Sequence, residues 1–184
     1  MTARGAAIAA VVLRLCHPVP SEGETRPEFL ARVSVIGEGV DEAARAVPWR
    51  FGRRAMAAAV LVIFEGESRF DLEVHAGRRR GDHGRAICLG SVHASKLAPD
   101  WAELGGTDAD ATFRCARAVA RNLRSKAWEC VTPDALSPAA GLSIRAMALI
   151  FEGYGRGHCA EPGRQAWERA EDWAALMVDG RWRK

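Results

Sequence analysis

An unbroken run of apolar residues at positions 55–64, AMAAAVLVIF, is the feature that most constrains the fold of this chain. A helix formed by this run would be apolar on every side, so other parts of the protein have to surround it. We therefore predict a buried central helix that begins near Trp49 or Phe51 and ends near Glu65, with the remaining helices packed around it.

Two glutamates, Glu65 and Glu67, follow this run with only Gly66 between them. Burial penalises the charged form of a carboxyl group and raises its pKa, which makes the group a proton donor near neutral pH. Raising the pKa of a glutamic acid from ~4.3 to about 6 destabilises the anion by roughly 2.3 kcal/mol. Because residues two apart on a helix point in different directions, we expect only one of the two carboxyls to serve a site.

Size and composition indicate one soluble globular domain, with 184 residues of which 48% are hydrophobic and 27% charged. No apolar stretch reaches the ~18 to 20 residues that cross a bilayer, so we expect no membrane span. The formal charge is +3, and basic residues cluster at 53–54, 78–80 and 181–184. We interpret these clusters as solvated faces and expect no nucleic acid partner, because aromatic residues do not alternate with them except at the C-terminus.

The five cysteines are odd in number and have no repeated spacing, which is not typical of a disulfide scaffold. We expect them to be small buried residues. The pairing of Cys115 with Cys130 is an alternative that requires two helices to meet there.

Around the central helix, periodicity and capping residues predict a mainly α (α+β) fold with a small β-hairpin beside Glu67. Alternation of apolar and polar residues predicts a strand over 70–74, a glycine-rich loop over 76–85 and a returning strand over 86–92. The segment 37–39, which contains Gly37 and Gly39, should interrupt or end a helix that begins at Pro27. Ser137 should begin a helix that the glycines at 153, 155 and 157 break. The further helices are expected at 3–15, 27–36, 42–47 with Asp41 as its cap, 108–126, 139–151, and from 161 or 165 to 178.

The segment Glu67-Ser68-Arg69-Phe70, followed by the glycine-rich stretch 81–90, resembles the soluble lytic transglycosylase and goose-type lysozyme superfamily. Residues 108–123 resemble the next helix of that family, and Tyr154-Gly155-Arg156-Gly157 resembles its Tyr-Asn-x-Gly segment. The resemblance covers 49–176 and implies a lysozyme-like domain over 49–184, preceded by a helical extension over 1–48. The chain departs from the family where a usual Gln is Ser91 and a usual Asn is Gly155.

By this resemblance, Glu67 is the single catalytic acid of an enzyme that cleaves the MurNAc-GlcNAc β-1,4 bond of peptidoglycan glycan strands, without a metal or an organic cofactor. The same carboxylate then helps the 6-hydroxyl of the sugar to close a 1,6-anhydro ring. Ser68, Ser91 and Tyr154 are implied as its neighbours or substrate contacts. If the enzyme hydrolyses instead, Asp82, or Asp71 as the second choice, would position the water.

Two rival interpretations come from the same residues. His75, His83, Cys88 and His93 could gather around zinc, although their spacing matches no standard zinc pattern; Cys88 beside His93 could also form a nucleophile pair. The second alternative is a catalytically weak or inactive lysozyme-like structural or assembly protein of a larger particle.

The N-terminal run at 6–13 resembles the core of a signal peptide, but Arg14 interrupts it and no small-x-small cleavage site follows. A muramidase without its own signal has to be delivered to the wall. We therefore expect the protein in a bacteriophage virion, or in the cytoplasm before release, with other proteins of a virion or wall-associated assembly as partners and the periplasmic cell wall as its place of action.

Overall fold

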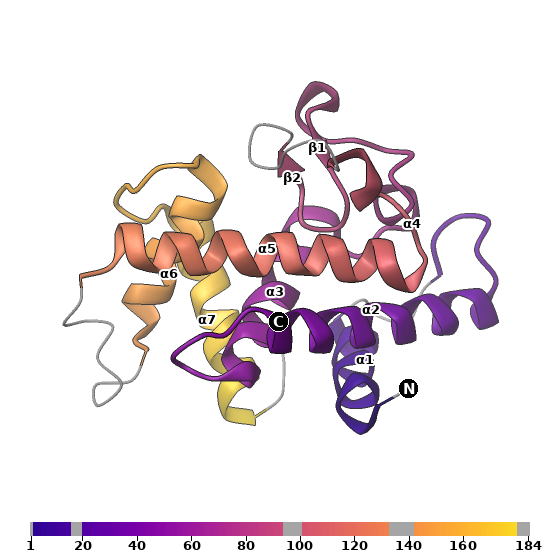
Figure 1. Cartoon of the computed structure of the whole chain (residues 1–184), viewed down its shortest axis with the longest axis horizontal. Coiled ribbons are helices and arrows are strands. Elements are labelled where there is room, and N and C mark those ends of the chain that lie inside the picture. Colours follow the sequence, from indigo (N-terminus) through magenta and orange to yellow (C-terminus); the bar gives the residue numbers. More distant parts are fainter. Residues whose placement is uncertain (1, 16–19, 94–100, 133–141, 180–184) are drawn as a thin grey trace.

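The computed structural model describes residues 2–15, 20–93, 101–132 and 142–179, which form a mainly helical protein with one small antiparallel sheet (Figure 1). This architecture confirms the predicted mainly α class with a hairpin. No helix in the described residues is long and apolar enough to cross a membrane. The α-helices are α1 Ala3–Leu15, α2 Arg26–Ala46, α3 Arg53–Ser68, α4 Leu72–His75, α5 Ala109–Cys130, α6 Ile144–Arg156 and α7 Arg164–Asp179, and the strands are β1 Ala86–Ile87 and β2 Val92–His93.

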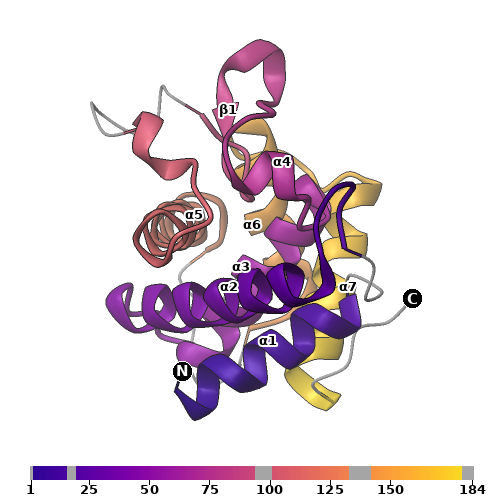
Figure 2. The same cartoon turned by 90° about the vertical axis from the view of Figure 1, so that its right-hand side faces the viewer.

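Helix α3 is the predicted central helix. Every residue of the run 55–64 is at most 8% exposed, and Figure 2, which looks along α5, shows α3 with α2, α5, α6 and α7 around it. The helix begins at Arg53 rather than at Trp49 or Phe51, and it continues past Glu65 to Ser68 because Arg69 adopts the left-handed conformation that ends helices. Glu65 and Glu67 therefore both lie on the last turns of the buried helix.

Helix α2 is one continuous helix, so the predicted break at residues 37–39 and the second helix capped by Asp41 were wrong. Its glycines permit close packing instead. A Cβ atom at Gly37 would lie 2.4 Å from the backbone oxygen of Gly5 in α1, and one at Gly39 would lie 2.9 Å from a side-chain carbon of Thr112 in α5. Asp41 is buried and forms an ion pair with Arg53 of α3.

The same hydrophobic core contains Val12 of α1, Ile36 of α2 and Phe64 of α3. Of the helices predicted to form an N-terminal extension, α2 thus packs on the central helix, and α1 packs on α2. The domain boundary at residue 48 stays a prediction.

The segment after Glu67 folds differently from the prediction. Residues 72–75 form the short helix α4 in place of a strand, because the Asp71 side chain accepts the Val74 N–H bond at 3.1 Å and caps that helix. The hairpin covers the expected returning strand and extends one residue beyond it, with Ala86 paired with His93 and Ile87 paired with Val92. A short 3₁₀ helix, Asp82–Gly84, lies in the predicted loop between α4 and the hairpin.

Helix α5 begins at the predicted cap, with the Asp108 carboxylate accepting the Ala111 N–H bond at 2.8 Å. Helix α6 has Ser143 as its N-cap; the start expected at Ser137 lies outside the described residues. Gly153 and Gly155 lie inside α6, contrary to the prediction, and only Gly157, in the left-handed conformation, ends it. Helix α7 covers most of the last predicted helix.

Two disulfides join distant segments, Cys88 with Cys115 and Cys130 with Cys159. The first ties the hairpin to α5, and the second ties the end of α5 to the residues that follow α6. Both the expectation of unbonded small residues and the alternative pairing of Cys115 with Cys130 were therefore wrong for these four cysteines. The fifth, Cys16, lies outside the described residues.

Candidate functional site

Glu67 lies on the last turn of α3 with its side chain 23% exposed. Arg169 of α7 donates a hydrogen bond from Nη2 to Oε1 of Glu67 at 2.7 Å, and the Arg169 side chain is only 8% exposed. A guanidinium bond to a carboxylate is charge-assisted and shielded here from most of the solvent. This partner fixes the direction in which the Glu67 carboxylate points.

Gly66 lets Arg169 come this close. A Cβ atom at position 66 would lie 2.7 Å from Nε and 2.9 Å from Nη2 of Arg169, so the guanidinium group lies directly against the backbone of α3. The sequence analysis did not identify Arg169. Its position in the sequence could have identified it. Arg169 lies between Ala166 and Trp173 on the apolar stripe that α7 presents to the core, and a charged side chain buried there needs a partner of opposite charge.

Glu65, the competing acid, lies near a different carboxyl. Burial raises its pKa, against the opposing charges of Arg69 and Arg169. Burial also raises the pKa of Asp172 on α7 to about 6, and the negative charge of Glu65 adds to that shift, followed by Glu171 and Glu168. The two glutamates therefore have different near neighbours, although the charge of Arg169 acts on both.

Tyr154 of α6 joins the hairpin segment to this site. Its hydroxyl donates a 2.6 Å hydrogen bond to the Gly90 carbonyl, and burial raises its pKa, with the negative charge of Glu67 as the next contribution. Gly90 has no room for a side chain, since a Cβ atom would lie 2.2 Å from a methyl group of Val119 in α5. Tyr154 was predicted to approach Glu67. The charge of Glu67 contributes to the raised pKa of Tyr154, and the Tyr154 hydroxyl itself is bonded to the Gly90 carbonyl.

The remaining predicted site residues bond elsewhere. The Ser68 hydroxyl donates to the Phe64 carbonyl at 2.6 Å and accepts the Phe70 N–H bond at 3.2 Å, so it shapes the end of α3. Ser91 is partly exposed, follows Gly90 and has a positive φ of 48°. Asp82 lies on the exposed 3₁₀ helix, where its carboxylate is 3.2 Å from Arg85 and 3.4 Å from His93.

Asp71, the second choice for positioning water, caps α4 and pairs with Arg79 at 2.9 Å. The Asp71 carboxylate therefore serves as a helix cap and as an ion-pair partner in the segment after α3.

The proposed metal ligands and nucleophile have other roles. Cys88 is bonded to Cys115, which removes its thiol both as a ligand and as a nucleophile. His75 is buried, with Nε2 2.8 Å from the Thr112 hydroxyl, and burial lowers its pKa to about 3. In the described part of the chain, no three His, Cys, Asp or Glu side chains gather closely enough to hold a metal ion.

A cavity of about 460 Å³ opens in front of Glu67, between α6 and α7. Glu152 in its wall is buried, pairs with Arg156 and accepts the Gly163 N–H bond at 3.0 Å. Charged and amide groups in such a wall can bind the hydroxyl and amide groups of a polar ligand. The polar side chains around the cavity are Glu67, Glu152, Arg156, Arg164, Gln165 and Arg169.

No family model, no curated protein and no solved structure matches this chain.

Proposed function

We propose that this protein is a peptidoglycan-cleaving glycosidase of the lytic transglycosylase type, with a lysozyme-like fold and Glu67 as its acid. One observation carries the proposal. The Glu67 carboxyl ends a helix that is buried over its whole apolar run, and it opens into a polar cavity of about 460 Å³. A carboxyl among the polar groups of such a wall can contact a bound ligand.

In the proposed reaction, the protonated Glu67 carboxyl donates its proton to the glycosidic oxygen as the bond from that oxygen to C1 breaks. The resulting carboxylate then accepts the proton of the sugar's 6-hydroxyl, whose oxygen bonds to C1 and closes the anhydro ring. Arg169, at 2.7 Å, stabilises the carboxylate form that exists between these two steps.

The hairpin segment supplies the other side of the proposed site. The residues that line the cavity come from α3, α6, α7 and the segment before α7. The Tyr154 hydroxyl binds the Gly90 carbonyl, and the adjacent Ser91 is the proposed substrate contact. Asp82, on the exposed loop that leads into the hairpin, is the proposed second contact.

The two disulfides support a location outside the reducing cytoplasm, because such bonds persist in oxidising compartments. The bacterial periplasm and a phage particle that reaches it from outside both meet this condition. We therefore propose the periplasmic cell wall as the place of action and a virion or wall-associated assembly as the carrier.

The test compares wild type, Glu67→Gln and Glu65→Gln on purified sacculi, with released muropeptides identified by mass spectrometry. A neutral amide cannot donate the proton, so Glu67→Gln should reduce release by about 10²- to 10⁴-fold. Glu65→Gln lies on the same helix turn and keeps Glu67 intact, so it should retain most of the activity. Equal release by wild type and Glu67→Gln, with both variants folded by circular dichroism, would refute the catalytic role of Glu67.

One observation favours the alternative of a structural or assembly protein with a lysozyme-like fold. Arg169 is already bonded to the Glu67 carboxylate, the group that would have to donate a proton. In addition, Ser91 and Gly155 stand where the lytic transglycosylase family usually has Gln and Asn. That alternative predicts no muropeptide release by wild type, even at enzyme concentrations stoichiometric with the glycan.

A further inference from the structure

Helix α5 carries a row of arginines on one side. Arg114, Arg117, Arg121 and Arg124 recur at alternating intervals of three and four residues, and the same spacing continues to Trp128. This spacing aligns side chains along one helix face, over about 21 Å at 1.5 Å per residue. We refer to the four arginines as the arginine row.

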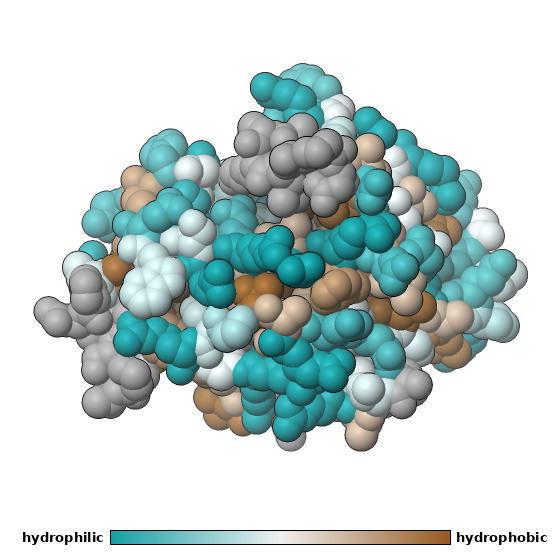
Figure 3. Space-filling model, in the orientation of Figure 1, coloured by the Kyte–Doolittle hydropathy of each residue, from teal (hydrophilic) through white to brown (hydrophobic). Residues whose placement is uncertain are grey.

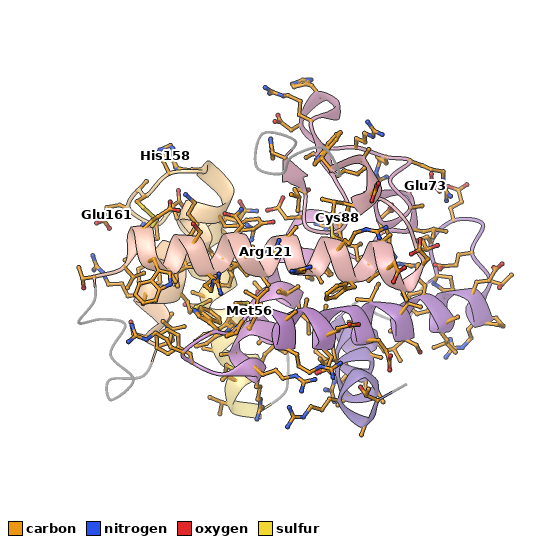
Figure 4. The ribbon with its side chains drawn as sticks, viewed as in Figure 1. Met56, Glu73, Cys88, Arg121, His158 and Glu161 are labelled. Carbon is orange, nitrogen blue, oxygen red and sulfur yellow. A yellow bond between two sulfur atoms is a disulfide. The ribbon has the colours of Figure 1, made fainter. Side chains whose placement is uncertain are left out.

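The row lies on the outside of the molecule. Arg121 and Arg124 are exposed, and Arg114 and Arg117 are partly exposed. Figure 3 shows hydrophilic side chains across the middle of the face along which α5 runs, and Figure 4 shows Arg121 on α5 at the front of the same view.

Within the described residues, the arginines of the row form no ion pairs, and the charge of Arg114 acts on Asp108, where it helps to lower the pKa of that carboxyl. Other exposed arginines pair with acids, as Arg78 does with Glu73 at 2.6 Å and Arg164 with Glu168 at 2.7 Å. Like charges three and four residues apart destabilise a helix. Repulsion between the arginines of the row therefore destabilises the helix, and a bound polyanion would reduce this repulsion.

An exposed tryptophan stands at the end of the row. Trp128 is 65% exposed, and the guanidinium group of Arg50 lies 5.4 Å from its ring centroid. Trp128, Arg50, Arg121 and Arg124 line a cavity of about 550 Å³, together with the Ser125 hydroxyl. The Glu129 carboxylate also lines this cavity and is bonded to Ser125 and Lys126. The three guanidinium groups outnumber it, so the cavity combines a flat apolar ring with a net positive charge, which suits a ligand that has both a flat apolar face and negative charges.

We propose that the arginine row and Trp128 bind an acidic glycan, a linear sugar chain that carries carboxylate or phosphate groups. The guanidinium groups hold the successive anionic groups by paired hydrogen bonds, and the indole of Trp128 stacks on the apolar face of one sugar ring.

Two observations favour a glycan over a single-stranded nucleic acid. Sites for the latter present several aromatic rings for successive bases, whereas among the described residues of α5 Phe113 is only partly exposed and Trp128 is the exposed ring. Both disulfides include a cysteine of α5, Cys115 or Cys130, so the row belongs to a helix suited to oxidising surroundings such as the cell surface, where acidic glycans occur.

The experiment measures binding of the full chain to oligogalacturonate, to phosphomannan, to neutral dextran oligosaccharide and to oligothymidylate, at two salt concentrations. At least one of the two acidic glycans should bind, with an affinity that falls as salt rises, and dextran should not. Comparing the carboxylated with the phosphorylated glycan identifies which anionic group the row selects.

Variants test the position of the site. Arg121→Gln/Arg124→Gln should weaken glycan binding about tenfold and flatten its salt dependence, and Trp128→Ala should weaken it about fivefold. The control Arg78→Gln/Arg145→Gln removes the same charge from other exposed positions and should leave the affinity within about twofold. Glu67→Gln should bind normally, so this test is independent of the proposed catalysis.

Absence of salt-dependent glycan binding would overturn the proposal, as would an equal loss of affinity in the control. Tighter binding of oligothymidylate than of either acidic glycan would also overturn it, in favour of a nucleic acid site.

Discussion

A single missing side chain decides the geometry around Glu67. Gly66 leaves the space in which the guanidinium group of Arg169 lies, and Arg169 in turn fixes the Glu67 carboxylate. A glycine inside a helix costs stability relative to alanine, so its presence at the end of α3 is explained by the approach of α7. The residue between the two glutamates is thus part of the site.

Gly66→Ala should therefore destabilise the protein, although alanine favours helices. Its Cβ atom would lie 2.7 Å from Arg169 Nε, and we expect a loss of about 1–3 kcal/mol in the free energy of unfolding, together with loss of muropeptide release. Gly155→Ala in α6 is the matched control. A Cβ atom there has no neighbour within 4 Å, so this variant should be neutral or more stable by up to ~1 kcal/mol. Urea unfolding of both variants gives the comparison, and a stable Gly66→Ala would contradict it.

Asp172 should make stability depend on pH. Its pKa is raised from 3.8 to about 6, first by burial and then by Glu65, so the folded protein keeps a proton that the unfolded chain has already released in this range. The free energy of unfolding should therefore fall as the pH rises from about 4 to about 6. Asp172→Asn stays neutral and should flatten this dependence. Urea unfolding at several pH values measures it; identical slopes for variant and wild type would exclude Asp172 as the cause.

At the scale of elements, the sequence predicted helices well and short connections poorly. The run 55–64 and the cap at Asp108 have strong local signals, and α3 and α5 formed where these signals lie. The break at 37–39 was wrong because a local sequence cannot show that another helix needs the space left by a glycine. The strand at 70–74 was wrong because three alternating residues also fit one capped helical turn.

The disulfide between the hairpin and α5 should stabilise the fold measurably. Cys88 and Cys115 are 27 residues apart in sequence, and closing a loop of that size corresponds to about 3–4 kcal/mol in the chain-entropy account. The variant Cys88→Ala/Cys115→Ala should lose stability of that order, and non-reducing peptide mapping of the wild type should show the bond. Free thiols at both positions under oxidising conditions would contradict the pairing.

At the scale of the whole molecule, the candidate site was only partly predictable. Glu67 could be proposed because a buried helix ends beside it in the sequence. Arg169 is 102 residues away from Glu67, and Tyr154 is 64 residues away from the Gly90 carbonyl that it binds, so both contacts depend on how α6 and α7 pack. The cysteine pairing likewise depends on which segments of the chain meet at α5, and the spacing of the cysteines in the sequence does not give that information.

Two covalent links start from α5, one to the hairpin and one to the segment beyond α6. Fraying of this helix is therefore opposed on both flanks, and its inner amides should exchange with solvent only when the entire protein unfolds. Helix α5 thus combines a row of like charges with covalent ties near both ends, which can keep its arginines aligned before a polyanion binds.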